Sequence, residues 1–286
     1  MTGDRDDPRA DLAPVRVDLG PGVTGLFTTR TGGTSPAPWD SLNLGLNVHD
    51  APERVRANRD LVARSVGAPL CFVTQVHGDG VVLVDGSAAP GAPGPEVTAD
   101  ALVATRPGHA LAITVADCVP VLLADAGARV VAAVHAGRAG VQAGVVPRAV
   151  AAMRAAGARD LRAVVGPCVC GRCYEVPQAL RDEVSRQVPA AFSTTRTGTP
   201  ALDLRAAVAA QLTDAGVADV RHVERCTLED ETFFSHRRAT AAGAAPTGRF
   251  AAVVVLDAGP GPDRPEALSE DGALGRVVPG RVRPGG

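Results

Sequence analysis

The sequence contains no lysine, and each of its 29 basic residues is an arginine. A lysine Schiff base or a lysine general base is therefore excluded from any mechanism. Aromatic residues make up only 3% of the chain, so valine, alanine and leucine must fill the interior. The formal net charge of −2 gives no excess of basic residues, and we expect no nucleic-acid partner. No apolar run reaches the roughly 18 residues of a membrane span, and we expect no membrane partner.

The chain also lacks the basic start and apolar segment of a signal peptide, because its first residues are acidic and polar. This predicts a cytoplasmic protein. Cytosolic thiols stay reduced, so we interpret the cysteines as free thiols or metal ligands rather than as disulfides. The six cysteines are residues 71, 118, 168, 170, 173 and 226.

Three segments are predicted to lie outside the folded core. Residues 1–14 are charged and without periodicity, which is typical of a disordered tail. Residues 258–286 are rich in proline, glycine and arginine and predict a second disordered tail. Residues 86–96 are expected to form an exposed loop. The remaining chain, residues 15–257, is predicted to form one catalytic domain.

Helical and strand patterns alternate within that domain. A helix is predicted over residues 52–66, with Asp50 as its N-terminal cap and a glycine as its stop. A second helix is expected around residues 180–188, and a third begins after Asp203 as its cap. Short β-branched runs bounded by turns indicate buried strands. These runs cover residues 111–116, 119–124, 129–134, 162–165 and 250–256. The pattern predicts an α/β or α+β domain with mixed sheets covered by helices.

Reactive side chains lie at the predicted ends of three strands. His77 is expected where a strand gives way to a glycine-rich turn. Asp117 and Cys118 interrupt two apolar strands. His135 ends a strand that is followed by a glycine-rich turn and a helix. Polar residues at strand ends are the usual way in which an α/β fold builds a site.

Two imidazoles and one thiolate form a coherent ligand set for Zn²⁺, with Cu²⁺ as the alternative. Three protein ligands leave one coordination position open, as in catalytic zinc sites. Asp117 beside the cysteine is a candidate proton carrier. The spacing of the three residues matches no short zinc-finger pattern, and each of them alone could be an ordinary core residue.

Several longer motifs occur in a fixed order and resemble the laccase-domain family (multicopper polyphenol oxidase-like, YfiH/YlmD type). The resemblance extends from about residue 23 to residue 256. The motifs are TTRTGG (28–33), SLNLG (41–45), TQVHG (74–78), TADALV (98–103), TVADCVPV (114–121), VHAG (134–137), GPCVCGRCYEV (166–176) and CTLEDETFFSHRR (226–238).

The resemblance implies a single layered α/β/β/α domain with mixed sheets and a metal site formed by His77, Cys118 and His135. It also implies purine nucleoside chemistry, namely phosphorolysis of adenosine, inosine, guanosine and methylthioadenosine together with deamination of adenosine. The expected partners are a nucleoside and phosphate, and the expected state is a monomer or weak homo-oligomer. Editing of a peptidoglycan precursor is an alternative activity of the family.

The site residues expected from the motifs fall into two groups. The catalytic candidates are Asp117, Cys118 and Arg59, and the substrate-binding candidates are Arg30, Asn43, Gln75, Arg138 and Tyr174. Among so many arginines, a solvated surface charge is the ordinary role of each. The chain departs from the family pattern His-Ala-Gly-Trp-Arg-Gly after His135, since it reads Arg138-Ala139 in place of Trp-Arg. Arg138 is a candidate for the guanidinium that the family places one residue later.

Three other functions remain open. Copper-dependent polyphenol oxidation uses similar ligands, but a full multicopper site needs more histidines than the six present. Cys118 with a nearby histidine could act as a nucleophilic dyad, which chelation would not inhibit. A non-catalytic metal-binding protein that acts through a partner is the third.

The spacing of Cys168, Cys170 and Cys173 suggests a second metal site, but no fourth ligand is evident in the sequence. We therefore favour packing for these cysteines, and likewise for Cys226.

Overall fold

A computed structural model of the chain describes residues 12–84, 97–243, 246–258 and 277–278. Its first sheet has five strands in the order β1-β2-β13-β6-β3 and is antiparallel except between β3 and β6. These strands are β1 (Val15–Asp18), β2 (Val23–Phe27), β13 (Phe250–Leu256), β6 (Ala110–Val115) and β3 (Leu70–Cys71). The expected mixed sheet is therefore present.

The second sheet has seven strands in the order β12-β9-β7-β8-β5-β4-β14, and β12 with β9 and β4 with β5 are its parallel pairs. The strands are β12 (Asp219–His222), β9 (Arg162–Val165), β7 (Val119–Asp125), β8 (Val130–Ala136), β5 (Ala101–Ala104), β4 (Val81–Val84) and β14 (Val277–Val278). A separate ribbon pairs β10 (Phe192–Thr194) with β11 (Pro200–Leu202).

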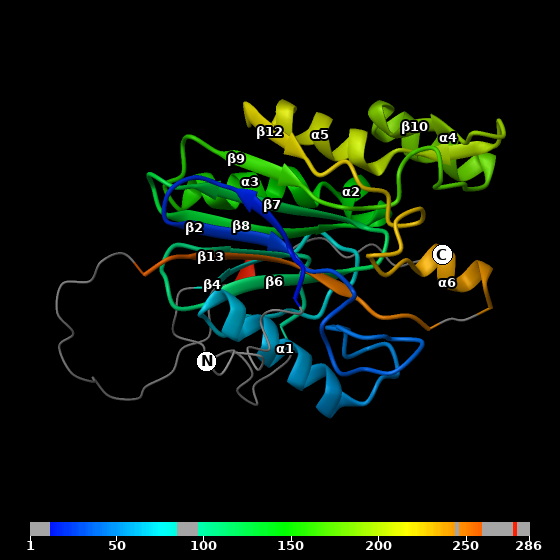
Figure 1. Ribbon diagram of the computed structural model, residues 1–286. Helices are drawn as coiled ribbons and strands as arrows, with labels where there is room; N and C mark the ends of the chain where they lie inside the picture. Colours follow the sequence, from blue (N-terminus) through cyan, green and yellow to red (C-terminus); the bar gives the residue numbers. More distant parts are fainter. Residues whose placement is uncertain (1–11, 85–96, 244–245, 259–276, 279–286) are drawn as a thin grey trace, which may run out of the picture.

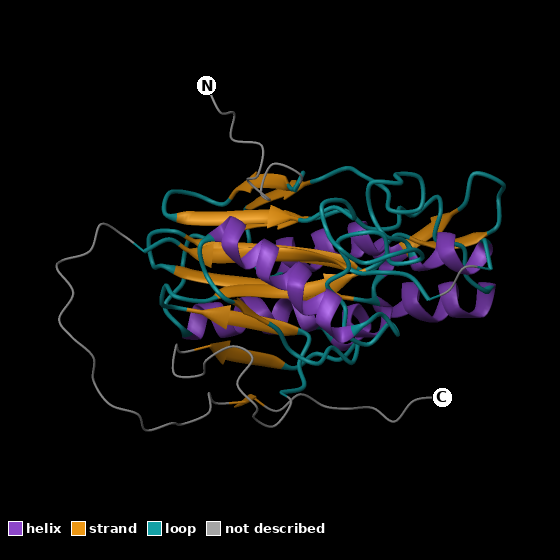
Figure 2. Ribbon diagram, turned by 60° about the horizontal axis from the view of Figure 1, so that its bottom comes forward, coloured by secondary structure: helices purple, strands orange, loops and turns teal. Residues whose placement is uncertain are grey.

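Helices cover the outer faces of the stacked sheets (Figure 1). Helix α1 (Pro52–Val66) packs on the five-stranded sheet. On the seven-stranded sheet lie α2 (Arg138–Ala143), α3 (Val145–Ala155) and α5 (Leu204–Asp214). The remaining helical segments are α4 (Gln178–Gln187), η1 (Pro189–Ala191) and α6 (His236–Ala241). Figure 2 shows the helices stacked against the strands from a second direction. The arrangement confirms the predicted α/β/β/α layering.

Strand β8 shows how the sequence produces these layers. All seven of its residues are buried, because the strand is covered on both faces. Val130, Ala132 and Val134 belong to the core under the helices. Val131 and Ala133 belong to the core between the two sheets. This alternation with a period of two places His135 on the side of the strand that faces the other sheet.

The predicted elements agree with the structure in type and, within about two residues, in position. One cap was wrong: Ala51 is the N-cap of α1, and Asp50 instead accepts hydrogen bonds from Ser35 Oγ at 2.6 Å and Asn43 Nδ2 at 2.8 Å. The cap at Asp203 is confirmed, since its carboxylate accepts the Ala206 N–H at 2.9 Å.

The helix predicted after His135 is in fact two helices. Gly144 separates α2 from α3 and has a φ of 85°, a left-handed conformation that favours glycine. The predicted loop at 86–96 lies outside the described residues, as do residues 1–11 and most of the segment 258–286. No helix of the described ranges is long and apolar enough to cross a membrane.

Candidate active site

His77 lies in a turn between β3 and β4, so the strand follows this histidine rather than preceding it as predicted. Its φ of 59° is unusual for a residue with a side chain. The turn is held by Asp100, whose carboxylate accepts the N–H groups of His77 at 3.0 Å and Gly78 at 2.7 Å. Asp100 is fully buried immediately before β5.

The same carboxylate also orients the second histidine. His135 Nδ1 lies 2.7 Å from Asp100 Oδ1, and both side chains are buried. Burial opposes ionisation of Asp100, but the hydrogen bond and charge of His135 lower its pKa below the usual 3.8. An imidazole that donates one N–H to a carboxylate keeps its other nitrogen free for a metal. Asp100 therefore fixes both histidines, a role that the sequence did not reveal although TADALV contains it.

Cys118 lies between β6 and β7, as predicted, and completes the group. Its Sγ is 3.7 Å from His77 Nε2, and the centroids of the two imidazole rings are 4.7 Å apart. Burial raises the pKa of the Cys118 thiol, but the neighbouring charge of His135 and hydrogen bonds from both histidines lower it to about 6. The contacts with the two histidines therefore favour the thiolate of Cys118 over its thiol.

Gly137 allows these three side chains to meet. A Cβ atom at this position would lie 2.5 Å from His77 Cδ2 and 3.2 Å from Cys118 Sγ. Any side chain there would displace one of them. The glycine-rich turn after β8 is thus required by close approach rather than by a special backbone conformation.

The residues fit a divalent metal. One donor atom each from His77, Cys118 and His135 lies within 4.8 Å of the others. A set of two nitrogens and one sulfur suits zinc and also copper. When bound, such an ion would supply a fixed positive charge and Lewis acidity beside the pocket described next.

Asp117 is the neighbour of Cys118 and is held rigidly. Its Oδ1 accepts the Thr227 hydroxyl at 2.6 Å, and its Oδ2 accepts the Arg237 N–H at 2.7 Å. Its own carbonyl accepts the Val169 N–H at 3.1 Å. These contacts maintain a φ of 86°, which is uncommon for aspartate. Thr227 and the start of α6 therefore hold the carboxylate of Asp117, and Val169 holds its backbone.

A pocket with a volume of about 350 Å³ opens beside the metal-ligand group. This size suits a small-molecule ligand. Arg138, Tyr174, His236 and Arg237 bring polar or aromatic groups to its wall. The Arg237 guanidinium carbon lies 5.2 Å from the centre of the Tyr174 ring, and its Nη1 donates to the Glu175 carbonyl at 2.8 Å. Burial raises the pKa of Tyr174, and the nearby Cys118 adds to this effect.

Five of the expected site residues are adjacent, whereas two expected arginines have other contacts. His77, Asp117, Cys118, Arg138 and Tyr174 all line the pocket, and His135 is the third member of the metal-ligand group beside it.

Arg59 does not line the pocket. It donates to the Leu44 carbonyl at 2.8 Å and its guanidinium stacks 3.7 Å from the Phe72 ring. Arg30 is paired with Asp40 at 2.8 Å. The geometry gives these two arginines framework roles.

Asn43 and Gln75 also lie outside the pocket wall. Asn43 is fully buried, and its amide oxygen accepts the Gly45 and Arg249 N–H groups at 3.0 and 2.9 Å. The Gln75 amide pairs with the backbone of Thr114 in both directions at 2.8 Å. Both side chains join loops to neighbouring strands, which explains why polar residues occur there without contact to the pocket.

His236 and Arg237 are pocket residues that the site prediction omitted. They begin α6, where Ser235 caps the helix by accepting the Arg238 N–H at 3.1 Å. The signal was available, since both lie in the motif CTLEDETFFSHRR.

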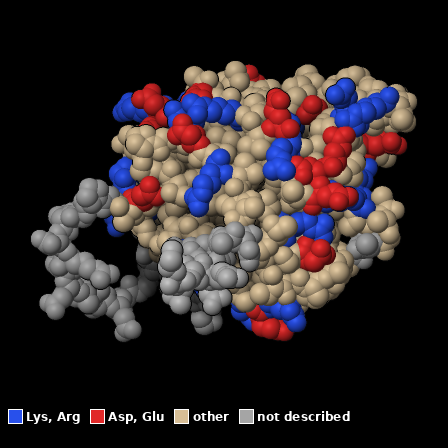
Figure 3. Space-filling view, in the orientation of Figure 1, with Lys and Arg blue, Asp and Glu red and all other residues tan. Residues whose placement is uncertain are grey.

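Arginine and acidic residues alternate over the visible face in Figure 3, so this face shows no broad patch of one sign.

Comparison with known proteins is consistent with this geometry. A family model described as multi-copper polyphenol oxidoreductase laccase matches residues 24–257. The chain belongs to this family. A purine nucleoside phosphorylase of Mycobacterium bovis is 50% identical over 241 residues, which cover 81% of this chain and 91% of the relative. A purine nucleoside phosphorylase of Streptomyces coelicolor is 50% identical over 236 residues, with 81% and 94% covered.

Solved structures share the fold. The crystal structure of the Bacillus licheniformis hypothetical protein YfiH superimposes with a TM-score of 0.76 at 33% identity and covers 88% of this chain and 98% of that one. A Neisseria meningitidis protein, NMB0706, has a TM-score of 0.74 at 35% identity, with 85% and 99% covered. The predicted family and fold class are thereby confirmed.

Proposed function

We propose that the chain is a metal-dependent purine nucleoside phosphorylase and that zinc is its metal. The observation that carries the proposal is one pocket that joins the group His77, Cys118 and His135 to two arginines, Arg138 and Arg237. The names of relatives that are 50% identical to the chain support the same activity. Adenosine, inosine, guanosine and methylthioadenosine are the proposed substrates.

Phosphorolysis requires an anion site beside the sugar. In the reaction, a phosphate oxygen forms a bond to C1′ of the ribose while the bond from C1′ to the base nitrogen breaks. The base leaves with the bonding electron pair and takes up a proton. Arg138 and Arg237 offer guanidinium groups for phosphate, which guanidinium binds well. Gln142 Oε1 accepts Arg138 Nη1 at 2.8 Å and thereby orients it.

The base would lie against the less polar residues of the pocket lining. These residues include Tyr174, Val169 and Leu204. A tyrosine ring gives a purine a stacking surface and its hydroxyl a hydrogen-bond partner. Both carboxylate oxygens of Asp117 accept hydrogen bonds, which fix the orientation of the side chain. We assign to Asp117 the proton that the leaving base takes up on its nitrogen.

Deamination of adenosine is the second activity that we assign to the pocket. In that reaction water replaces the amino group at C6 and ammonia leaves. The observation in its favour is that the group has three protein ligands rather than four, so an ion held there would keep one position for water. Asp117 would carry the proton between the water and the leaving amine.

Turnover of adenosine and inosine with and without phosphate tests the proposal. The metal-loaded protein should release hypoxanthine from inosine only with phosphate, and should form inosine from adenosine without it. Arg138→Ala should raise the KM for phosphate about 10-fold or more, because a charged hydrogen bond is worth about 1.5–3 kcal/mol. Arg186→Ala, which changes an exposed arginine of α4 outside the pocket, is the matched control.

Two outcomes would overturn the assignment. Absence of any nucleoside turnover at full metal occupancy would favour the peptidoglycan precursor or a non-catalytic role. Activity that survives chelation but is lost on thiol alkylation would favour Cys118 as a nucleophile.

Among the described residues only one metal-ligand group contains histidine, which argues against a multicopper oxidase.

A further inference from the structure

Two loops far apart in the sequence each carry a pair of possible metal ligands separated by two residues. Cys170 and Cys173 flank one turn, which is closed by the Cys173 N–H donating to the Cys170 carbonyl at 2.9 Å. Cys226 and Glu229 flank the other, where the Glu229 N–H donates to the Cys226 carbonyl at 3.1 Å. Ligand pairs with this spacing on tight turns are typical of structural zinc sites. Each turn therefore has the form of half such a site.

Backbone pairing holds the two turns against each other. Cys168 and Cys226 form an isolated parallel β-bridge, in which the Thr227 N–H donates to the Cys168 carbonyl at 3.1 Å. The Cys168 N–H donates to the Arg225 carbonyl at 3.4 Å. Cys168 thus acts through its backbone, and its buried side chain packs in the core under the helices.

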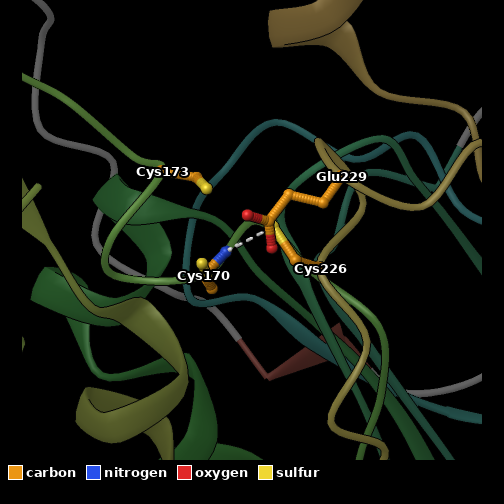
Figure 4. A group of neighbouring side chains, drawn as sticks. All are labelled: Cys170, Cys173, Cys226 and Glu229. Carbon is orange, nitrogen blue, oxygen red and sulfur yellow. Dashed lines mark hydrogen bonds between the residues drawn. The ribbon is translucent and has the colours of Figure 1, made fainter. Parts of the chain in front are cut away.

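The four side chains converge as a result (Figure 4). One donor atom from each of Cys170, Cys173, Cys226 and Glu229 lies within 4.8 Å of the others. The Cys170 N–H also donates to Cys226 Sγ at 3.3 Å, a contact that joins the two turns next to the group. The ligand set differs from the triad of cysteines that the sequence suggested: Cys226 and Glu229 take part, and Cys168 does not.

An arginine beside the group would balance its charge with an ion bound. Three thiolate ligands and a carboxylate would then carry more negative charge than one divalent ion neutralises. Arg196 lies beside the group, where it forms an ion pair with Glu229 and its Nη1 lies 3.4 Å from Cys173 Sγ. Its guanidinium would offset part of the excess.

We propose that Cys170, Cys173, Cys226 and Glu229 form a second zinc site. With four protein ligands the site is closed and structural, in contrast to the three-ligand group at the pocket. It would stabilise the pocket wall, because Tyr174 follows Cys173 and Thr227, which follows Cys226, donates to Asp117. The proposal does not depend on the substrate of the pocket.

Zinc content of a variant that lacks the first group tests the site separately. The full chain with His77→Ala and His135→Ala should retain roughly one zinc per chain after dialysis, measured by mass spectrometry of the metal. Adding Cys173→Ser should remove that zinc. Adding Cys71→Ser instead should leave it, since Cys71 lies in β3 and belongs to neither group.

A milder variant and a spectroscopic measurement distinguish loss of zinc from loss of folding. Glu229→Gln keeps the three thiols and should release zinc to a chelator at least 10-fold faster than the parent double variant. Cobalt bound to the double variant should show strong thiolate-to-cobalt charge-transfer absorption that Cys173→Ser weakens. Circular dichroism checks that each variant is folded.

Three results would overturn the proposal. The first is a folded double variant that purifies without zinc and takes up no cobalt. The second is zinc that persists unchanged when Cys173→Ser is added to the double variant and the protein stays folded, which would mean adventitious binding only. The third is a disulfide among the three cysteines of the group in freshly purified protein, detected by mass as the loss of two hydrogen atoms.

Discussion

The two ligand groups differ in the kind of backbone that carries them. Cys118 and His135 lie at the ends of long buried strands, and the turn of His77 is fixed by a buried carboxylate. The group of Cys170 and Cys226 instead lies on short turns joined by one β-bridge. A catalytic ion needs ligands that are oriented toward a pocket, whereas a structural ion needs only a complete set of protein ligands. The sheets provide the orientation at the first group, and short turns are enough to bring together the ligands of the second.

Loss of a ligand at the first group should give the largest effect on catalysis. His135→Ala removes one of three ligands and leaves Asp100 buried without its partner. We expect nucleoside turnover to fall by more than the roughly 10- to 100-fold that loss of a supporting partner costs. Steady-state kinetics with inosine and phosphate measure it. Full activity in a folded variant would show that this group is not the catalytic one.

Loss of a ligand at the second group should affect stability more than chemistry. A metal present at about 1,000 times its Kd stabilises the fold by roughly 4 kcal/mol. Cys226→Ser should therefore lower Tm by roughly 10 °C. Differential scanning fluorimetry with and without a chelator measures the shift, and Cys71→Ser is the control. If the chelator shifts Cys226→Ser and the parent equally, the stabilising metal lies elsewhere.

Weakening Asp100, which supports the first group, should have a smaller effect than removing one of its ligands. Asp100→Asn keeps the size of the side chain but weakens its bonds to His135 and to the turn of His77. We expect a loss of about 10- to 100-fold in metal affinity at this group, with the second group unchanged. Competition with a zinc indicator gives both affinities. An equal loss at both groups would indicate general unfolding.

Asp125 provides a matched buried aspartate remote from both groups. Its carboxylate ends β7 and accepts the N–H groups of Ala128, Arg159 and Asp160 at 2.7–2.9 Å. Asp125→Asn should cost about 1 kcal/mol of stability and leave both metal contents unchanged. If Asp125→Asn also lost metal, the effect of Asp100→Asn on metal binding would not be specific to Asp100.

The same residue predicts a pH dependence. Burial opposes its ionisation, but the backbone hydrogen bonds prevail and hold the pKa of Asp125 below 3.8. A depressed pKa in the folded state means that the stabilisation is complete above pH 3.8 and is lost as the pH falls through the folded value. Urea unfolding from neutral pH to acid should therefore show a smaller decline for Asp125→Asn than for the parent.

Strand periodicity and motif order made much of the first site predictable. Cys118 and His135 stand at strand ends, where the alternation of buried residues also assigns a face to His135. Asp100 escaped prediction because a single carboxylate before a strand resembles any turn residue. Arg59 and Asn43 contact neighbouring loops in the structure, and their predicted roles at the site stay predictions. A motif shows that a position is constrained but does not distinguish substrate contact from contact with a buried loop.

The second group could not be assembled from the sequence. Its two halves lie 56 residues apart between Cys170 and Cys226, and neither half alone has four ligands. Their meeting depends on the bridge between Cys168 and Cys226, which no local pattern encodes. Long-range pairing of this kind requires the tertiary structure.

The left-handed backbone of Asp117 has a consequence for protein engineering. Glycine adopts such a φ without a side-chain clash, so Asp117→Gly would relieve strain of about 1 kcal/mol. It would also leave the Thr227 hydroxyl and the Arg237 N–H without their acceptor, at a cost of about 1–3 kcal/mol for each buried group. A selection for heat resistance alone should therefore retain the carboxylate that we assign to proton transfer, even though its backbone is strained.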